Sequence, residues 1–242
     1  MVIASMIKLE AQQLIKEATS AGRKALLEPE AKALLSAWRI DVPKSALLKT
    51  EDDLRVALKK VSPPYVLKVI SPDILHKSDI GGVVTGLNNQ EEIEKAFKEI
   101  KKKISEKSAR ARIDGFLLEE MAPKGVEVII GGLRDDQFGS AVMFGIGGIA
   151  VELMKDVSYR LAPLDKEEAM SMMKELKSYP LLTGYRGSSP VDLGKLGEAI
   201  VKVSEIIAEL EGIKEMEINP LIVYKDGVMA VDARVVLTGG IS

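Results

Sequence analysis

The sequence predicts an α+β fold, on three observations. The expected helices and strands do not alternate regularly, because an αβαβ start is followed by mixed strands, a long helix and a terminal hairpin. A doubly wound parallel sheet would alternate more strictly. Apolar residues form 46% of the 242 residues and charged residues 29%, which is typical of globular proteins. No repeat with a period of a solenoid and no low-complexity tract is present.

The first half of the chain is predicted to interleave helices with short strands. Apolar residues at a spacing of three or four mark the helices, as at Ile93 and Phe97. Pro43 and Pro63-Pro64 are stop signals for two of them. The expected elements, in order, are two helices within 1–40, a strand at 46–48, a helix at 51–61, a buried strand at 65–70, a polar loop at 71–82, a strand at 83–87 and a helix at 90–108.

The second half is predicted to consist mainly of strands. Glycine-rich turns separate the apolar runs, and Asp226-Gly227 between two such runs is a strong signal for a β-hairpin. A long helix is indicated where Leu196, Ile200 and Val203 share one side. The expected elements are strands at 115–121, 126–133, 140–144 and 157–162, helices at 165–177 and 192–211, and closing strands at 215–223 and 228–236.

Composition excludes several classes of protein. A net charge of −2 argues against a broad basic face that neutralises nucleic-acid phosphates. Cysteine is absent, which excludes disulfides, thiolate metal sites and thiol nucleophiles. No apolar run approaches the roughly 18–20 residues that span a bilayer, and the amino terminus lacks the long apolar segment of a signal peptide. We therefore expect a cytoplasmic protein with neither a nucleic-acid nor a membrane partner.

The closing hairpin gathers oxygen donors on one face. Glu217 and Asn219 are two residues apart on a strand and so point the same way. Counting back from the turn, Asp232 falls opposite Asn219 or one pair away. Such oxygens suit Mg²⁺, which shares its ligands with substrate phosphates, although a polar outer strand face gives the same pattern. Arg234 follows on the same side and suggests an anion beside the cation.

Lys68 is the one charged residue of a strand that otherwise reads as buried. A lysine there either reaches the sheet edge or holds an anion, because an unpaired buried charge is costly. Methionine would keep much of its apolar stem, so replacing Lys68 by Met is expected to cost little stability. Gly81 and Gly82 in the following loop would let backbone N–H groups approach a phosphate, although a tight turn explains them equally well.

His76, the only histidine, lies in that same loop. A lone histidine is often structural or merely solvated. Here polar residues surround it, between a lysine-bearing strand and a double glycine. Imidazole can act there as a general base or as a nucleophile that accepts phosphate.

Two further sets of residues are candidates for binding a nucleotide. The backbone at Glu120 and Met121, with the acid Glu127 nearby, would suit an adenine edge and a ribose diol. Charges that protect a sheet edge from aggregation explain the same pattern. Arg186 lies on a loop flanked by glycines, and arginine is the preferred clamp for anions, although surface arginines are common.

Taken together, these segments resemble an ATP-grasp domain. More narrowly, they resemble the β subunits of ADP-forming acetyl-CoA synthetases (acetate–CoA ligases), over essentially the whole chain. The matching motifs are Leu67-Lys68-Val69, the loop 71–79 with Gly81-Gly82-Val83, Gly184-Tyr185-Arg186-Gly187, and Glu217-Ile218-Asn219-Pro220-Leu221. Succinyl-CoA synthetases share the fold but lack a histidine at the position of His76, which separates the two groups.

The resemblance implies a single ATP-grasp domain over 1–242, with two α+β subdomains whose mixed or antiparallel sheets clasp the nucleotide. The first subdomain covers about 44–122 and the second about 123–242, with the helical segment 1–43 packing on the second. It also implies which residues bind ligands and which are catalytic. The implied residues are Asn219 and Asp232 for Mg²⁺; Lys68, Gly81, Gly82, Glu120, Met121, Glu127 and Arg234 for ATP or ADP; and His76, Glu217 and Arg186 for catalysis.

The reaction implied by the resemblance passes through a phosphohistidine at His76, which carries the phosphoryl group to ADP. The chain has no second histidine and no CoA-binding domain, so it should depend on an α subunit that supplies both, in an α2β2 hetero-oligomer. The acid is acetate by resemblance, with other acids, GDP in place of ADP and the stoichiometry left open. Two other functions stay open: an ATP-grasp carboxylate–amine ligase without phosphohistidine, and a nucleotide-sensing module without turnover.

Overall fold

The computed structural model describes residues 2–74, 76–147 and 155–239 of the chain. They form two compact units, each with its own sheet and hydrophobic core. The large unit comprises Met1–Val42 and Lys124–Ser242, and the small unit comprises Pro43–Pro123. Within the described ranges, no helix is both long and apolar enough to cross a membrane.

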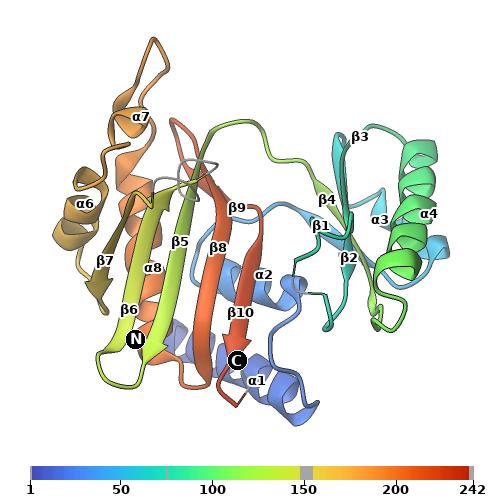
Figure 1. Cartoon of the computed structure of the whole chain (residues 1–242), viewed down its shortest axis with the longest axis horizontal. Coiled ribbons are helices and arrows are strands. Elements are labelled where there is room, and N and C mark those ends of the chain that lie inside the picture. The colour runs from blue at the N-terminus through green and yellow to red at the C-terminus, as the bar shows by residue number, and fades with distance from the viewer. Residues whose placement is uncertain (1, 75, 148–154, 240–242) are drawn as a thin grey trace. The chain divides into compact units, whose positions relative to one another are not determined.

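The small unit is built on a four-stranded antiparallel sheet with the order β1-β4-β2-β3 (Figure 1). Its strands are β1 (Ser45–Leu48), β2 (Tyr65–Ile70), β3 (Val83–Leu87) and β4 (Gly115–Glu120). Helix α4 (Gln90–Lys107) packs on one face, together with the short α3 (Leu54–Ala57), which follows the 3-10 turn η1 (Glu51–Asp53).

Local sequence explains why α4 forms where it does. The Asn89 side chain accepts a hydrogen bond from the Glu92 amide at 2.9 Å, which caps the helix start. Ile93 and Phe97 are buried against the sheet, where they meet Leu67 and other side chains of the same core. Residues that alternate with Leu67 along β2 therefore lie on the sheet face turned away from α4.

The large unit contains a six-stranded antiparallel sheet with the order β10-β8-β5-β6-β7, in which β9 also pairs with β8. Its strands are β5 (Val126–Asp135), β6 (Gly139–Ile146), β7 (Val157–Leu161), β8 (Ile213–Val223), β9 (Val228–Ala230) and β10 (Ala233–Leu237).

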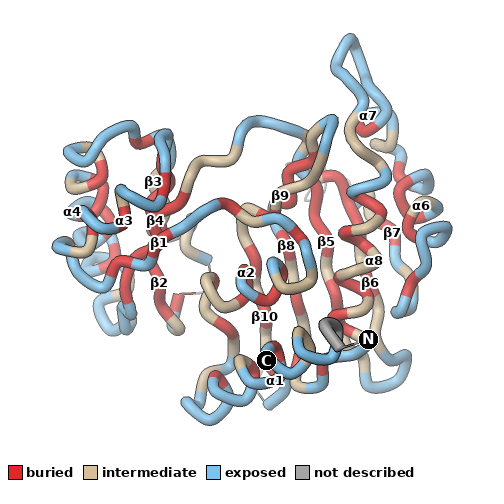
Figure 2. The backbone as a smooth tube through the Cα atoms, turned by 180° about the vertical axis from the view of Figure 1, so that it is seen from behind, coloured by how far each residue is buried: buried red, intermediate tan, exposed pale blue. Residues whose placement is uncertain are grey.

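Helices cover one face of this sheet, as the two opposite views show (Figures 1 and 2). They are α1 (Val2–Ser20), α2 (Glu28–Ala37), α6 (Lys166–Lys174) and α8 (Leu193–Glu209), with the short α7 (Pro180–Thr183) following α6. Ile130, Phe144 and Ile218 point from the sheet into this core. Residues that alternate with them point the other way, onto a surface that we call the open face.

Strand register defines rows across the open face. Glu217 pairs with Arg234 on one side and with Gly131 on the other, Gly131 pairs with Met143, and Met143 pairs with Tyr159. Directly opposed residues of an antiparallel sheet share a face, so these five residues form one row. The open face is therefore polar along β8 and β10 and apolar along β6 and β7.

Three predicted elements differ most from the structure, whereas others differ by one or two residues at an end. The expected helix at 51–61 contains a 3-10 turn and a helix that ends at Ala57. The expected strand at 228–236 is divided into β9 and β10, because Pro220 on β8 has no N–H for the ladder there. The helix expected at 165–177 covers Lys166–Lys174, starting from the Asp165 cap, and α7 was not expected.

Candidate functional site

The terminal strands bring two of the predicted metal ligands opposite each other. The Asn219 amide donates to the Asp232 carbonyl at 3.2 Å, and the Val231 amide donates to the Pro220 carbonyl at 3.0 Å. These bonds continue the register of Glu217 with Arg234. The open face thus carries Asn219 and Asp232 side by side, next to Glu217 and Arg234.

Hydrogen bonds orient these side chains. Asn219 Nδ2 donates to Glu217 Oε1 at 3.1 Å, which directs the Asn219 carbonyl oxygen away from Glu217. Asp232 Oδ1 accepts from the Ala233 amide at 2.9 Å. Arg234 forms ion pairs with Glu215 and, at 3.7 Å, with Glu217. The anions next to Arg234 in this structure are therefore the carboxylates of Glu215 and Glu217.

The donor set fits a magnesium ion shared with phosphates. Among the residues that the structure describes, no group of three or more histidine and acidic residues could hold a metal alone. Magnesium typically takes one or two carboxylates from a protein and completes its octahedron with water and substrate phosphate oxygens. One amide oxygen and one carboxylate on the open face match that sparse requirement.

Lys68 is paired inside the small unit. Its Nζ lies 2.9 Å from Glu119 Oε2, and the two side chains are only 5% and 1% exposed. Leu117 is opposite Lys68 and Val66 is opposite Glu119, so the pair bridges β2 and β4 diagonally on one face. Sequence reasoning missed Glu119, although a lysine in a buried strand calls for an acid on a neighbouring strand.

The glycines after β2 make a tight turn. The Gly82 amide donates to the Lys77 carbonyl at 2.7 Å, and the Gly81 amide donates to the Ser78 carbonyl at 3.0 Å. A Cβ at Gly82 would lie 2.7 Å from Val69 Cγ1, so only glycine fits there. Both N–H groups expected to face a phosphate donate within the loop in this conformation, which favours the tight-turn explanation.

His76 is exposed in this loop, between two fixed points. On one side, Asp73 Oδ2 accepts from the Arg112 amide at 2.7 Å. On the other side, Lys107 Nζ of α4 donates to the Asp79 carbonyl at 3.1 Å. Leu75, part of the motif expected here, lies outside the described residues.

The residues predicted to hold the base and the ribose belong to different units. In the small unit, Glu120 Oε1 accepts from the Ser62 amide at 3.0 Å, and the Met121 amide donates to the Pro64 carbonyl at 2.7 Å. The Met121 N–H expected to read an adenine edge is thus engaged. Glu127 is exposed on β5 of the large unit.

Arg186 projects from an exposed loop after α7. Its φ of +52° is left-handed, between Gly184 at +98° and Gly187 at +88°. Non-glycine residues rarely adopt this conformation, and such residues cluster in functional loops. The guanidinium stacks 5.4 Å from the centre of the Tyr185 ring, and Ser188 Oγ closes the turn by donating to the Tyr185 carbonyl at 2.8 Å.

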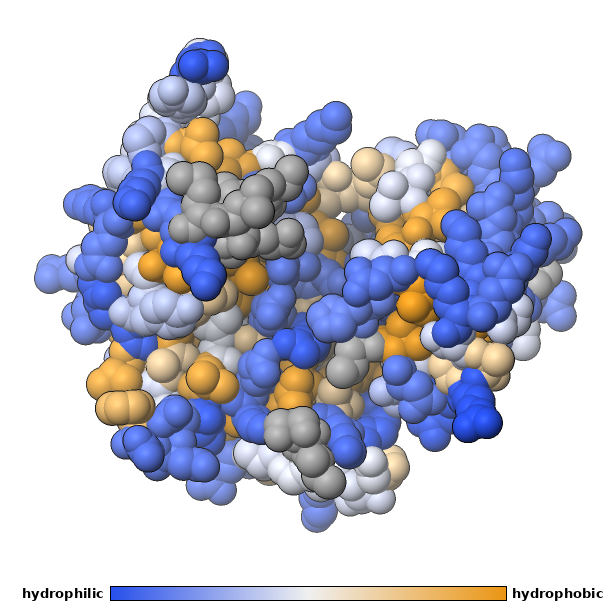
Figure 3. All heavy atoms as spheres, in the orientation of Figure 1, coloured by the Kyte–Doolittle hydropathy of each residue, from blue (hydrophilic) through white to orange (hydrophobic). Residues whose placement is uncertain are grey.

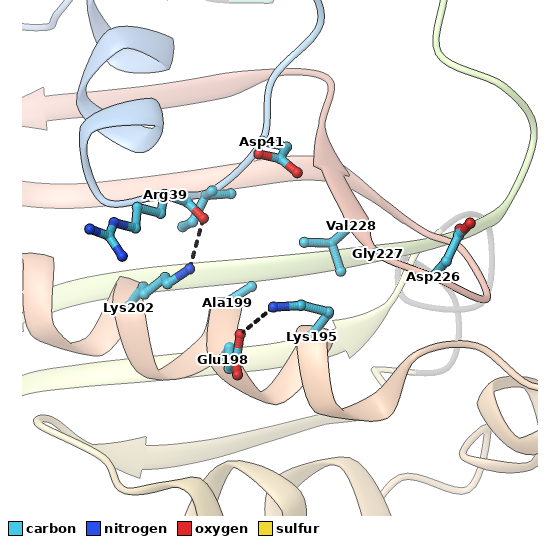
Figure 4. Close-up of a pocket in the computed structure, with 10 residues that line it drawn as sticks. Arg39, Asp41, Lys195, Glu198, Ala199, Lys202, Asp226, Gly227 and Val228 are labelled. Carbon is cyan, nitrogen blue, oxygen red and sulfur yellow. Dashed lines mark hydrogen bonds and ion pairs between the residues drawn. The ribbon is translucent and has the colours of Figure 1, made fainter.

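A cavity of about 400 Å³ lies elsewhere in the large unit, between α8, the segment after α2 and the β8–β9 turn (Figure 4). Two lysines of its wall are bound to neighbouring groups: Lys195 Nζ is 3.0 Å from Glu198 Oε2, and Lys202 Nζ donates to the Arg39 carbonyl at 2.7 Å. The hydrogen bond that Lys195 donates to Glu198 raises the pKa of Lys195 and lowers the pKa of Glu198. The cavity contains no predicted site residue.

Comparison with known proteins supplies the family. A model of the ATP-grasp domain matches residues 17–237. The chain is 44% identical to the acetate–CoA ligase [ADP-forming] I subunit beta of Pyrococcus furiosus, covering 94% of this chain and 98% of that one. It is 40% identical to the 4-hydroxybutyrate–CoA ligase [ADP-forming] of Nitrosopumilus maritimus, covering 91% of this chain but 32% of that longer one.

A solved structure is similar to almost the whole chain. The chain superposes with a TM-score of 0.80 and 45% identity on the dinucleotide forming acetyl-coenzyme A synthetase 1 of Ca. Korarchaeum cryptofilum, covering 94% of this chain and 99% of that one. That protein was solved with coenzyme A and Mg-AMPPCP, its phosphohistidine segment pointing towards the nucleotide binding site.

Proposed function

The chain belongs to the ATP-grasp domain family, and we propose that it is the nucleotide-binding β subunit of an ADP-forming acyl-CoA synthetase, with acetate as the favoured acid. The complete enzyme interconverts acyl-CoA, ADP and phosphate with the acid, CoA and ATP. The observation that carries the proposal is His76, the only histidine of the chain, exposed in the loop after the Lys68 strand.

The two units are, on this proposal, the two subdomains of the ATP-grasp fold. The small unit supplies Lys68, the His76 loop and the backbone at Glu120 and Met121. The large unit supplies Glu127, Arg186 and the polar part of the open face. The amino-terminal helices belong with the large unit, where the Leu26 amide donates to the Val235 carbonyl at 2.9 Å.

Asn219 and Asp232 would hold the magnesium ion of Mg·ATP, supported by their opposed positions on the open face. A bound magnesium ion neutralises phosphate charge during phosphoryl transfer. Glu217 keeps the Asn219 amide oriented through their 3.1 Å hydrogen bond. Arg234 and Arg186 offer guanidinium groups to the nucleotide phosphates.

His76 would carry the phosphoryl group between partner and nucleotide. A ring nitrogen of neutral imidazole takes the phosphoryl group by forming an N–P bond while the N–P bond to the partner's phosphohistidine breaks and that imidazole leaves. That bond breaks when an oxygen of the ADP β-phosphate attacks the phosphorus, which yields ATP and free imidazole. The phosphoryl group adds about two negative charges to the loop, and Lys77 beside His76 offers a nearby cation.

A CoA-binding subunit with the first phosphate-accepting histidine completes the enzyme, in an α2β2 assembly. Support comes from the beta-subunit name of the Pyrococcus relative and from the longer 4-hydroxybutyrate–CoA ligase, of which this chain matches 32%. The isolated chain should bind nucleotide yet make no acyl-CoA.

Radioactive phosphate from ATP tests the proposal. With magnesium, the wild-type chain should retain label that is lost in acid and stable in base. His76→Ala should retain none while binding ATP with unchanged affinity by calorimetry. Ser78→Ala, an exposed neighbour in the same loop, serves as the control and should label normally.

Three outcomes would contradict the proposal. Near-normal turnover of the complex with His76→Ala would leave the histidine as part of a nucleotide-covering loop. Nucleotide binding with no label and no turnover beside any partner would favour a sensing module. Formation of an acyl phosphate without protein-bound label would favour a carboxylate–amine ligase.

A further inference from the structure

The open face of the large sheet ends in exposed apolar side chains. Leu161 and Tyr159 on β7 are each 61% exposed, Leu133 on β5 is 45% exposed, and Phe138 in the β5–β6 turn is 73% exposed. We call these four residues the apolar patch. In the space-filling view, apolar side chains gather at the lower left, over the β5–β7 part of the sheet (Figure 3).

Strand register places the members of the patch together. Leu133 pairs with Ala141, and Ala141 pairs with Leu161, so a small residue separates the two leucines along one row. Tyr159 lies in the next row, two residues from Leu161 on the same side of β7. Arg160, which alternates with them, turns to the helix side and pairs with Glu175 after α6. The patch therefore faces away from the core of its own unit.

We propose that the apolar patch is the docking surface for the CoA-binding subunit. This inference rests on the proposed function, because it needs that subunit to exist. Single exposed apolar residues are ordinary on a protein surface, whereas a contiguous group of leucine and aromatic side chains marks an interaction site. Such residues are the usual anchors at the centre of an interface.

The identity of the occupant follows from the relatives. The match with this chain covers 98% of the Pyrococcus beta subunit but only 32% of the Nitrosopumilus ligase. On the proposed function, the further part of the longer ligase corresponds to the separate CoA-binding subunit with which a beta subunit associates. An interface of standard size buries about 800 Å² on each partner. The beta chain therefore needs an exposed surface that can be buried against the CoA-binding subunit.

Continuity with the polar rows favours the same occupant. Tyr159 and Met143 share their row with Glu217 and Arg234, and Glu215 pairs with Leu133 in the next row. A subunit docked on the patch would border the residues proposed to hold Mg·ATP. The acids at this border outnumber Arg234, so the complementary surface should be apolar with a basic rim.

Charge substitution tests the docking surface. The full chain is co-expressed with its cognate CoA-binding subunit, and the dissociation constant is measured by sedimentation. Leu161→Glu and Phe138→Glu should each weaken the complex at least tenfold while ATP affinity of the isolated chain stays unchanged. Leu9→Glu, a 68% exposed leucine on α1, is the matched control and should bind like the wild type.

Hydrogen exchange on the wild-type complex gives a second measurement that needs no variant. Amides of β7 and the β5–β6 turn should become protected when the CoA-binding subunit is added. Unchanged affinity of both patch variants together with unchanged exchange would overturn the inference and leave the proposed function intact. Failure of the wild-type chain to bind that subunit at all would overturn both. Self-association of the isolated chain that Leu161→Glu abolishes would assign the patch to a second copy instead.

Discussion

The small and the large sheet both carry charged side chains on the face turned away from their helices, but they hold them differently. On the small sheet, Lys68 and Glu119 are almost completely buried and meet at 2.9 Å. On the large sheet, Glu217 and Arg234 remain 31% and 30% exposed and lie 3.7 Å apart. The first pair is shielded from water, whereas the second lies on a surface that it shares with exposed Asn219.

This difference separates two consequences of losing a charge. Removing one member of a buried pair strands the other charge in a medium of low dielectric, so the protein loses stability. Removing a charge from a solvated surface costs little stability, and any large effect must come from a bound ligand. Strand position alone does not tell the two cases apart, but burial does.

Lys68→Met should show the largest effect on stability. The apolar stem of methionine predicts a small cost, but the structure revises that expectation because buried Glu119 would lose the ammonium group that lies 2.9 Å from it. We expect the free energy of unfolding to fall by about 3–5 kcal/mol. Urea denaturation followed by circular dichroism measures it.

The double variant Lys68→Met with Glu119→Leu is the matched control for that prediction. It removes both charges and should recover most of the lost stability, because apolar replacements of a buried pair are often neutral or stabilising. Calorimetry on the double variant then isolates the contribution of Lys68 to ATP affinity. A stable Lys68→Met single variant with weak ATP binding would show that the nucleotide, rather than the fold, depends on the lysine.

Features of the fold that depend on local sequence could be predicted, whereas features that depend on distant pairing could not. The α4 helix follows from the spacing of Ile93 and Phe97. Counting residues back from the Asp-Gly turn predicts Asp232 opposite Asn219 or one pair away, and the structure has the first of these. Glu119 lies about fifty residues from Lys68, and no local signal fixes the register of β2 with β4.

The candidate site was predictable to a similar extent. The spacing of Glu217, Asn219 and Asp232 predicts that they share one face of the terminal strands, as they do, whereas their ligands stay predictions. The amides of Gly81, Gly82 and Met121 were assigned to a nucleotide, but the structure has them donating to Ser78, Lys77 and Pro64 carbonyls. A glycine pair does not reveal whether its N–H groups are occupied, because that depends on how the loop folds back.

Asn219→Ala and Asp232→Ala should show the next largest effect, on the ligand instead of the fold. Each removes an oxygen proposed to hold magnesium, and we expect the affinity for Mg·ATP to fall by about 10–100-fold. The free energy of unfolding without ligand should change by less than about 0.5 kcal/mol, because both side chains lie on the open face. Isothermal calorimetry with and without magnesium measures the affinity.

Asp226→Ala provides the control for these variants. Asp226 is an exposed acid in the β8–β9 turn and is not part of the proposed metal site. Its loss should leave the affinity for Mg·ATP unchanged. Equal affinity of all three variants would remove the metal site from the open face, and a large loss of stability in Asn219→Ala would place it among structural residues like Lys68.

Glu215→Gln should have the smallest effect and gives the sharpest test of the comparison. Glu215 and Glu217 both pair with Arg234, so one carboxylate remains when the other is neutralised. Partly exposed ion pairs contribute about 0–1 kcal/mol, and salt screens them. The difference in unfolding free energy from the wild type should therefore stay below about 1 kcal/mol and shrink when the salt concentration is raised to about 1 M.

The loss of stability in Lys68→Met should persist at that salt concentration, because salt screens buried pairs much less. If the two variants lost similar stability with similar salt dependence, burial would not be what distinguishes the two sheets.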